Sequence, residues 1–289
     1  MVPYSLFRAE RPIRGRRAAN RNFTVQLSAD KSEVGGMASL HSILDHLDSL
    51  LQPEAYDDYG PNGLQVPGRE DVGTVVTGVS ANAELFARAR EESADLVLVH
   101  HGLFWAGPPR ALDRASKRRL QLLFDADMSL AAYHLPLDGH LEHGNNALLA
   151  QAIGCERWEP FGAHRGATIG VAGRLPDDGI GAGELVARIR AATDRDPLSF
   201  TDGPERVRTV AIVSGAGADY LEDAIAAGLD AFVTGEPIER AMSRARESAV
   251  HFVAAGHYAT ETFGVRRLGD LLAARFGIRH VFVDVPNPI

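Results

Sequence analysis

Short apolar segments alternate with amphipathic helices along most of the chain, and this alternation constrains the fold most strongly. Alternation of strand and helix favours an α/β architecture with largely parallel pairing. The strands are expected at 72–79, 96–99, 129–133, 167–173, 207–213, 230–233, 250–254 and 279–283. The helices are expected at 40–51, 83–90, 112–126, 144–153, 183–193, 219–227, 237–247 and 259–276, while 57–68 reads as a loop.

Length and an internal echo both suggest two related halves. A chain of 289 residues corresponds to about two domains at ~150 residues each. In each half a valine-rich strand and a helix precede a short apolar strand that opens onto a polar turn. The two copies read GVS…DLVLVHHG and IVSGAG…DAFVTGE. We therefore expect two halves built on the same plan.

The first 36 residues differ from the rest in charge. Six Arg and one Lys stand against three carboxylates there, although the whole chain carries a net charge of −8. We predict that residues 1–36 are a disordered basic leader. Two alternatives are an arm that contacts nucleic acid and a start codon assigned too early, with translation beginning at Met37. The acidic remainder argues against nucleic-acid binding outside the leader.

Hydropathy and cysteine content restrict the cellular location. No run of about 18 apolar residues is present, so no membrane-spanning helix is expected. The leader also lacks the apolar core of a secretory signal. With Cys155 as its one cysteine, the chain cannot form an internal disulfide, and a reducing cytoplasm is the expected location.

Three expected strands run directly into polar clusters, and these clusters carry the chemistry. The segments are LVLV followed by His100 and His101, LAAY followed by His134 and Asp138, and HFVAA followed by Gly256 and His257. Ligands of open α/β sheets bind beyond the carboxyl ends of the strands. We therefore expect the three clusters to meet at one sheet edge.

The clusters together offer ligands for two divalent ions. The predicted ligands are His100, His101, Asp138, His257 and Glu261. Adjacent histidines that leave the pleat can serve two different ions, Asp138 could bridge them, and His257 and Glu261 are four residues apart near a helix start. Imidazole with carboxylate suits Zn²⁺, Fe²⁺, Mn²⁺, Co²⁺ or Ni²⁺ and does not suit Ca²⁺ or Mg²⁺ alone.

Each cluster has a simpler explanation when it is taken alone. A histidine at a strand end is often only hydrogen-bonded, Asp138 could be a turn residue, and His257 with Glu261 could be a salt bridge. The coincidence of all three clusters favours a metal site. His134 and Glu236 are candidate catalytic groups that shuttle protons. Glu236 could instead support a metal ligand from behind, or be a simple charge at a helix N-terminus.

The motifs that contain these residues resemble one known family. In chain order they read NGLQVPG, ADLVLVHHGLFW, YHLPLDGH with HGNN, TGE and GHYATE. They are similar to the dinuclear-metal toroidal hexamer family, whose members are labelled GTP cyclohydrolase 1 type 2 homologues or YbgI-like. The resemblance covers about residues 38–288 and does not include the basic leader.

The resemblance implies an architecture and an assembly. It implies two similar three-layer α/β/α lobes with mixed, largely parallel sheets. The metal-site lobe would comprise residues 37–160 and 230–289, and the second lobe residues 161–229. The chain would form a homohexameric ring, and motif matching assigns the metal ligands to the same five residues that their placement selects.

The expected function follows from a site for two metals. A metal-dependent hydrolase is expected to act on a small molecule, either like a GTP cyclohydrolase at C8 of guanine or like a phosphoesterase. No phosphate-binding loop of the G-x-x-x-x-G-K-[ST] type is present. The alternatives are a non-catalytic ring that handles metal or acts as a scaffold, and metals that only hold the two lobes in place.

Overall fold

The computed structural model describes residues 35–107 and 111–289. The leader, residues 1–36, was predicted to be disordered, and its residues 1–34 lie outside the described residues. Of the remaining two, Gly36 donates its backbone N–H to the Gly277 carbonyl over 3.2 Å. Within the described ranges no helix is long and apolar enough to cross a membrane.

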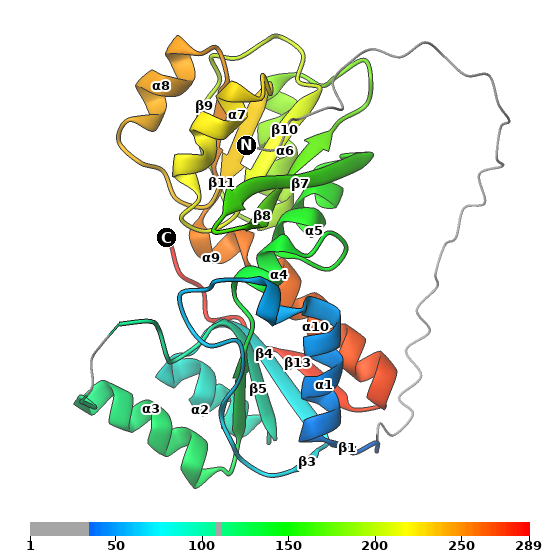
Figure 1. Ribbon diagram of the computed structural model, residues 1–289, viewed down its shortest axis with the longest axis vertical. Coiled ribbons are helices and arrows are strands. Elements are labelled where there is room, and N and C mark those ends of the chain that lie inside the picture. The colour runs from blue at the N-terminus through cyan, green and yellow to red at the C-terminus, as the bar shows by residue number, and fades with distance from the viewer. Residues whose placement is uncertain (1–34, 108–110) are drawn as a thin grey trace, which may run out of the picture. The chain divides into compact units, whose positions relative to one another are not determined.

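Five strands form the first sheet in the order β13-β4-β5-β6-β2. In Figure 1 this sheet is found by the labels β13, β4 and β5. The three pairings from β13 to β6 are parallel, and β2 joins antiparallel to β6 at the edge. The strands span Arg279–Phe282 (β13), Thr74–Ser80 (β4), Leu96–His101 (β5), Ser129–Ala132 (β6) and Gly63–Val66 (β2).

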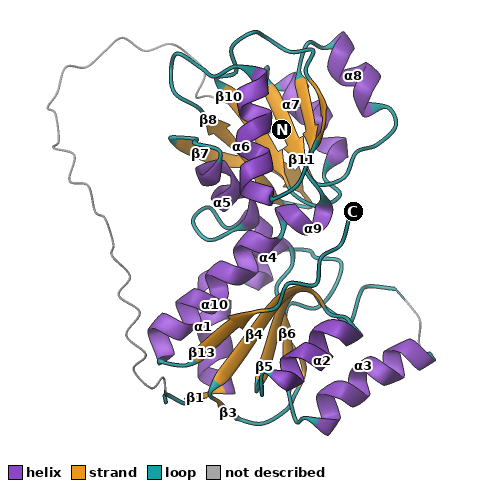
Figure 2. Ribbon diagram, turned by 180° about the vertical axis from the view of Figure 1, so that it is seen from behind, coloured by secondary structure: helices purple, strands orange, loops and turns teal. Residues whose placement is uncertain are grey.

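Helices cover both faces of this first sheet (Figure 2). Side chains of β5 alternate between the two faces. Leu96 and Leu98 pack with α1 (Leu40–Leu51) and α10 (Thr262–Phe276), while Val97 and Val99 pack with α2 (Ala83–Glu91) and α3 (Arg114–Asp125). Burial on both faces explains why this strand is apolar at successive positions.

The second sheet has six strands in the order β7-β8-β10-β11-β12-β9. Its central pairings, β10 with β11 and β11 with β12, are parallel, and its three outer pairings are antiparallel. The strands span Arg157–His164 (β7), Ala167–Arg174 (β8), Thr209–Val213 (β10), Ala231–Thr234 (β11), His251–Ala254 (β12) and Leu198–Phe200 (β9).

This second sheet also lies between two layers of helices. The hydrophobic core on one face includes residues of α5 (Asn145–Ala152) and α6 (Ala182–Thr193). The core on the other face includes residues of α7 (Leu221–Ala226) and α8 (Ala241–Glu247). Elements outside these layers include the antiparallel pair β1 (Ala38–Ser39) and β3 (Asp71–Val72), and the 3₁₀ turns η1 (Pro53–Ala55) and η2 (Ala218–Tyr220).

The α/β class expected from the alternation is confirmed, with sheets that are mixed and parallel at their centres. The division between the lobes differs from the expected one, in which the second lobe is 161–229. β11 and β12 pair with β10 and therefore belong to the second sheet, which the chain enters at β7 and leaves after β12. After β12 the chain returns to the first sheet through α10 and β13.

The structure differs from the local expectations in three places. The expected loop 57–68 contains β2, a short edge strand hidden by flanking Gly, Pro and Asn. β7 and β9 lie in segments with no strand pattern, and β7 accommodates Pro160 because it is an edge strand. The helix expected from residue 237 begins at Ala241.

The carboxyl ends of the two sheets face each other, and this arrangement positions the polar clusters. β5 and β6 belong to the first sheet, whereas β12 belongs to the second, so the expectation of one shared sheet edge is wrong. The short helices α4 (Leu135–Gly139) and α9 (His257–Thr260) lie between the sheets (Figure 1). Ser214, which follows β10, donates a hydrogen bond across this junction to Asp138 over 3.0 Å.

Close packing in the second sheet generates a prediction about stability. A Cβ atom at Gly170 would lie 2.5 Å from the Ile212 carbonyl oxygen and 2.7 Å from a Val213 methyl group. We expect Gly170→Ala to lower the free energy of unfolding by ~1–3 kcal/mol through overpacking. Gly183→Ala in α6 is the matched control, because nothing lies within 4 Å of its Cβ position. Urea denaturation compares the two, and an equal effect would contradict the packing argument.

Candidate metal centre

The end of β5 presents two histidines whose rings are held from behind. β5 continues through His101, which pairs with Ser80, so the expectation that both histidines leave the pleat is wrong. His100 is fully buried, and its Nδ1 lies 3.0 Å from the Tyr133 carbonyl oxygen. His101 Nδ1 lies 3.0 Å from the Ser80 hydroxyl. These contacts leave the Nε2 atom of each ring directed toward the centre.

α9 and the residue after it bring a third imidazole and a carboxylate. His257 Nδ1 lies 2.5 Å from Glu236 Oε1, and its Nε2 lies 3.1 Å from Glu261 Oε2. Glu261 stands in the break between α9 and α10 and is almost completely buried. The expected continuous helix 259–276 is therefore interrupted at this position, where the carboxylate turns toward the histidines.

Glu261 is the residue common to two groups of possible metal ligands. Its Oε2 lies 3.2 Å from His101 Nε2, and its Oε1 lies 3.6 Å from His100 Nε2. One of these groups consists of His101, His257 and Glu261, and the other of His100, Asp138 and Glu261. A third possible group, which lacks Glu261, consists of His100, His101 and His134. The structure thus brings together all five residues that the sequence indicated as ligands.

Asp138 was expected to bridge two ions, but it belongs to one ligand group alone. Its Oδ2 lies 3.5 Å from His100 Nε2, but its Oδ1 accepts hydrogen bonds from Asn145 Nδ2 over 2.8 Å and from Ser214 Oγ over 3.0 Å. Only one oxygen of Asp138 is therefore free to face the centre. Glu261 is instead the residue that two of the candidate ligand groups have in common.

The donor atoms fit divalent metal ions. His100 Nε2 and Glu261 Oε2 are buried and have no hydrogen-bond partner among the described residues. A buried polar atom without a partner costs about 1–3 kcal/mol, and a cation would satisfy both atoms. Three imidazoles with two carboxylates suit Zn²⁺ and the first-row transition metals. The outward nitrogens of the three rings are held by hydrogen bonds, as is usual for metal-binding histidines.

Gly215 supplies space that any side chain would remove. It follows β10 with a φ of +59°, and a Cβ atom there would lie 2.3 Å from Glu261 Oε1 and 3.2 Å from His257 Nε2. Sequence reasoning did not assign Ser214 or Gly215 to the site. The available signal was the internal echo, because IVSGAG places Ser214 and Gly215 at the end of a strand in the second half.

His134 stands beside the centre in a pair with Asp58. Its Nδ1 lies 2.7 Å from Asp58 Oδ1, and one of its ring nitrogens lies within 4.8 Å of the donor atoms of His100 and His101. Burial alone would raise the pKa of Asp58, but hydrogen bonds from His134, Asn62 and the Leu135 backbone lower it. Asp58 is thus an ionised acceptor, and sequence reasoning missed it because it lies in the expected loop 57–68.

The electrostatics of the cluster favour proton uptake when no cation is bound. Burial opposes the charged form of His100, but Asp138 and Glu261 raise its pKa to about 9. Burial likewise opposes the charged form of His257, but the carboxylates of Glu261 and Glu236 raise its pKa to about 9. Burial, together with the positive charge of its neighbours, lowers the pKa of His101 to about 3.

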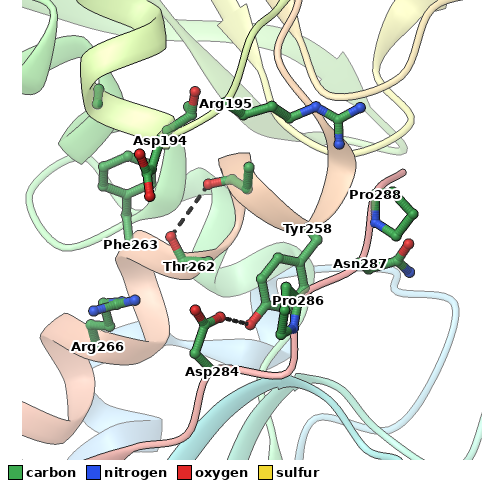
Figure 3. A pocket seen from close by; sticks show the side chains of 13 residues that line it. Asp194, Arg195, Tyr258, Thr262, Phe263, Arg266, Asp284, Pro286, Asn287 and Pro288 are labelled. Atoms are coloured by element: carbon green, nitrogen blue, oxygen red, sulfur yellow. Dashed lines mark hydrogen bonds between the residues drawn. The ribbon is translucent and has the colours of Figure 1, made fainter.

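The far side of α9 is held by the last residues of the chain (Figure 3). Tyr258 Oη donates to Asp284 Oδ1 over 2.5 Å and accepts from the Val285 backbone N–H over 3.0 Å. A cavity of about 730 Å³ lies on this side, and its lining includes Tyr258, Asp284, Arg195 and Arg266. These contacts fix the short helix that carries His257.

The fold and site together define a mixed α/β protein with a buried imidazole–carboxylate cluster between two sheets. The family model described as Duf34/NIF3 (NGG1p interacting factor 3) matches residues 38–288. The chain belongs to this family. The match begins at β1 and includes every residue of the candidate centre.

Curated relatives extend over nearly the same range. A protein of Pseudomonas aeruginosa named GTP cyclohydrolase 1 type 2 homolog is 42% identical over 250 residues, covering 86% of this chain and 98% of that protein. A protein of Archaeoglobus fulgidus with the same name is 40% identical over 249 residues, covering 86% and 99%.

Solved structures agree with the fold. A protein described as ybgI, of unknown function, is 38% identical with a TM-score of 0.82, covering 87% of this chain and all of that one. TTHA1606 from Thermus thermophilus is 37% identical with a TM-score of 0.79 and the same coverage. Reduced HcgD from Methanocaldococcus jannaschii, at 19% identity and a TM-score of 0.76 over 86% of this chain and 99% of that one, shows likeness of fold alone.

The shared position of Glu261 generates a prediction about metal stoichiometry. Because Glu261 belongs to both ligand groups and Asp138 to one, their substitutions should differ. We expect the chain to bind about two divalent ions, Asp138→Asn to retain about one and Glu261→Gln to retain fewer than one. Elemental analysis after dialysis against a limiting metal buffer measures this. Equal loss in both variants would contradict the shared role of Glu261.

The raised pKa values of two histidines predict how metal affinity depends on pH. Metal ligation requires neutral imidazole, so protons on His100 and His257 compete with the metal. Since both pKa values are about 9, apparent affinity should rise with pH up to about 9, by about tenfold per pH unit for each proton displaced. Calorimetric titration in buffers of different ionisation enthalpy counts the released protons. Affinity that is flat above about pH 7 would contradict the prediction.

Proposed function

We propose that this chain is a hydrolase that depends on two divalent metal ions per molecule. The observation that carries the proposal is the pair of ligand groups that share Glu261, with buried donor atoms that lack other partners. The ions would be held by the five residues that the sequence indicated, and Zn, Fe, Mn, Co or Ni suits this donor set. Bound ions would supply Lewis acidity and stabilise developing negative charge on the substrate.

In this proposal the proton carrier is His134. Asp58 is an ionised acceptor 2.7 Å from His134 Nδ1, so that nitrogen holds the proton and donates it to the carboxylate. The opposite nitrogen, Nε2, then has a free lone pair. It can take a proton from an attacking water and return it to a leaving group. Asp58 acts as a positioning residue because it fixes the tautomer and orientation of the ring.

In this proposal Glu236 has a positioning role, which is one of the three roles that the sequence allowed for it. Its carboxylate lies 2.5 Å from His257 Nδ1. A carboxylate behind a metal-binding imidazole orients the ring and makes the opposite nitrogen a better ligand. His134 therefore remains the one proton shuttle in the proposal.

Two kinds of hydrolysis fit this arrangement. The curated relatives carry the name GTP cyclohydrolase 1 type 2 homolog, which suggests attack on a purine ring. A centre for two metals suits phosphoester cleavage equally well. Both reactions need a group that takes a proton from water, and both therefore depend on His134.

Substitution of His134 separates catalysis from metal binding. We expect His134→Gln to lower kcat by about 10²–10⁴-fold on whichever nucleotide or phosphoester proves to be turned over, because the proton carrier is lost. Asp58→Asn should produce a smaller loss of the same kind. His140→Gln is the control, since His140 stacks on His143 and belongs to none of the ligand groups.

Metal content decides how a loss of turnover is interpreted. Elemental analysis should show unchanged metal in His134→Gln and Asp58→Asn. Full metal loading without turnover of any compound in a panel of nucleotides and phosphoesters would reject the hydrolase. That result would favour a protein that stores or delivers metal, because such a site needs no proton carrier.

We further propose that the chain assembles into a homohexameric ring in the cytoplasm. The family resemblance supports the ring, and the single cysteine fits a reducing compartment. Light scattering coupled to size-exclusion chromatography measures the assembly. We expect a mass of about six chains, and a monomer at micromolar concentration would contradict the ring.

A further inference from the structure

Two large aromatic side chains beside the candidate metal centre remain exposed. Tyr59 is 44% exposed and Trp105 is 42% exposed, whereas most large side chains of both lobes are buried. The Trp105 ring lies 5.1 Å from the His134 ring and 5.9 Å from the His101 ring, between centroids. The Tyr59 ring lies 6.2 Å from that of His134. Both rings therefore border the proposed proton carrier.

The loops that carry these rings are fixed against each other. Gln65 Oε1 accepts a hydrogen bond from the Leu103 backbone N–H over 2.8 Å, while its Nε2 donates to the Pro61 carbonyl over 2.8 Å. The Ala106 backbone N–H donates to the Tyr59 carbonyl. A Cβ atom at Gly60 would lie 2.5 Å from the Phe104 carbonyl oxygen, so the loops are in close contact. The backbone segments that carry the two rings are thus fixed against each other.

Trp105, His134 and Tyr59 form a row of rings, and the turn between β7 and β8 of the second sheet extends it. His164 and Arg165 lie at the turn between β7 and β8, and the His164 ring is 5.3 Å from the Tyr59 ring. The Arg165 guanidinium lies over Tyr59 at 5.1 Å from its centroid. Arg165 is also 3.4 Å from Asp57, so its charge is partly neutralised. A ligand that approaches the row would therefore meet mainly aromatic surface and only a partly neutralised positive charge.

We propose that Trp105 and Tyr59 form a stacking site for a substrate that contains a flat conjugated heterocycle, such as a nucleobase. This inference rests on the proposed function and names the substrate class of the same site. Flat rings stack on exposed aromatic side chains through their π-faces, whatever the substituents of the ring. Because Trp105 contacts His101 and His134, a stacked ring is held beside the ligand groups and the proton carrier.

Trp105 itself provides a binding signal that does not depend on turnover. The chain contains two tryptophans, Trp105 and Trp158. Trp158 lies in β7 of the second sheet, away from the row of rings, and donates its indole N–H to the Leu141 carbonyl. Trp158→Phe leaves Trp105 as the one tryptophan. We expect saturable quenching of its fluorescence when guanosine or adenosine is added to this metal-loaded protein, after inner-filter correction with free tryptophan. Ribose, which lacks the heterocycle, should cause no change.

Variants measured by calorimetry test the stacking contact. In the otherwise unaltered chain we expect Trp105→Leu to bind guanosine about tenfold more weakly, which corresponds to ~1.4 kcal/mol. Trp105→Phe should recover most of the affinity. Phe104→Leu is the matched control, since Phe104 is on the same loop, is 41% exposed and is not part of the row. Its affinity should stay within about twofold of the original.

The possible failures are distinguishable. Unquenched Trp105 at saturating metal, or equal affinities in Trp105→Leu and Phe104→Leu, would overturn the stacking site. Hydrolysis of a ringless phosphoester by a protein that does not bind nucleosides would also overturn it, while leaving the hydrolase intact. Quenching by nucleosides without any turnover would support the stacking site and count against the hydrolase instead.

Discussion

A carboxylate buried among three imidazoles is the constraint on which the rest of the site depends. Glu261 is 2% exposed, and its two oxygens face rings from both lobes. Burial of a charge is costly unless that charge is paired. His100 and His101 come from the first sheet, and His257 from the element that follows the second. When no cation is bound, protonated His100 and His257 offset this charge, and the cluster joins the carboxyl ends of two sheets.

The surrounding structure holds each donor from behind. The outward nitrogens of the three histidines contact the Tyr133 carbonyl, the Ser80 hydroxyl and the Glu236 carboxylate. Asp138 is held by Asn145 and Ser214, and Asn145 Oδ1 in turn accepts from the Gly264 backbone in α10. Such prior positioning reduces the reorganisation that binding or catalysis would require. It also explains why small residues such as Gly215 stand next to the donors.

Strong local patterns made much of this predictable from the sequence. The apolar run before His100, the helix 40–51 and the spacing of His257 and Glu261 each depend on near neighbours in the chain. The five candidate ligands were found because polar residues at strand ends stand out against apolar strands. Edge strands were missed where charged residues and Pro160 obscured their pattern.

What could not be predicted depends on contacts between distant segments. The internal echo places β10 and β11 in one half, but nothing local indicates that β12 joins the same sheet, and therefore that the centre lies between two sheets. Asp58 is 76 positions from His134, and Ser214 is 76 positions from Asp138, yet each pair is hydrogen-bonded. That two candidate ligand groups share Glu261, and that Asp138 belongs to one of them alone, also follows only from the facing of the sheets.

The most direct test of the centre is anomalous diffraction from crystals of the full chain, recorded on both sides of the absorption edge of the metal that copurifies with it. Two anomalous peaks should flank the Glu261 carboxylate, one near His101 and His257 and the other near His100 and Asp138. Crystals grown with Zn²⁺, Mn²⁺, Fe²⁺, Co²⁺ and Ni²⁺ in turn that show no peak beside Glu261 with any of these metals would contradict the account.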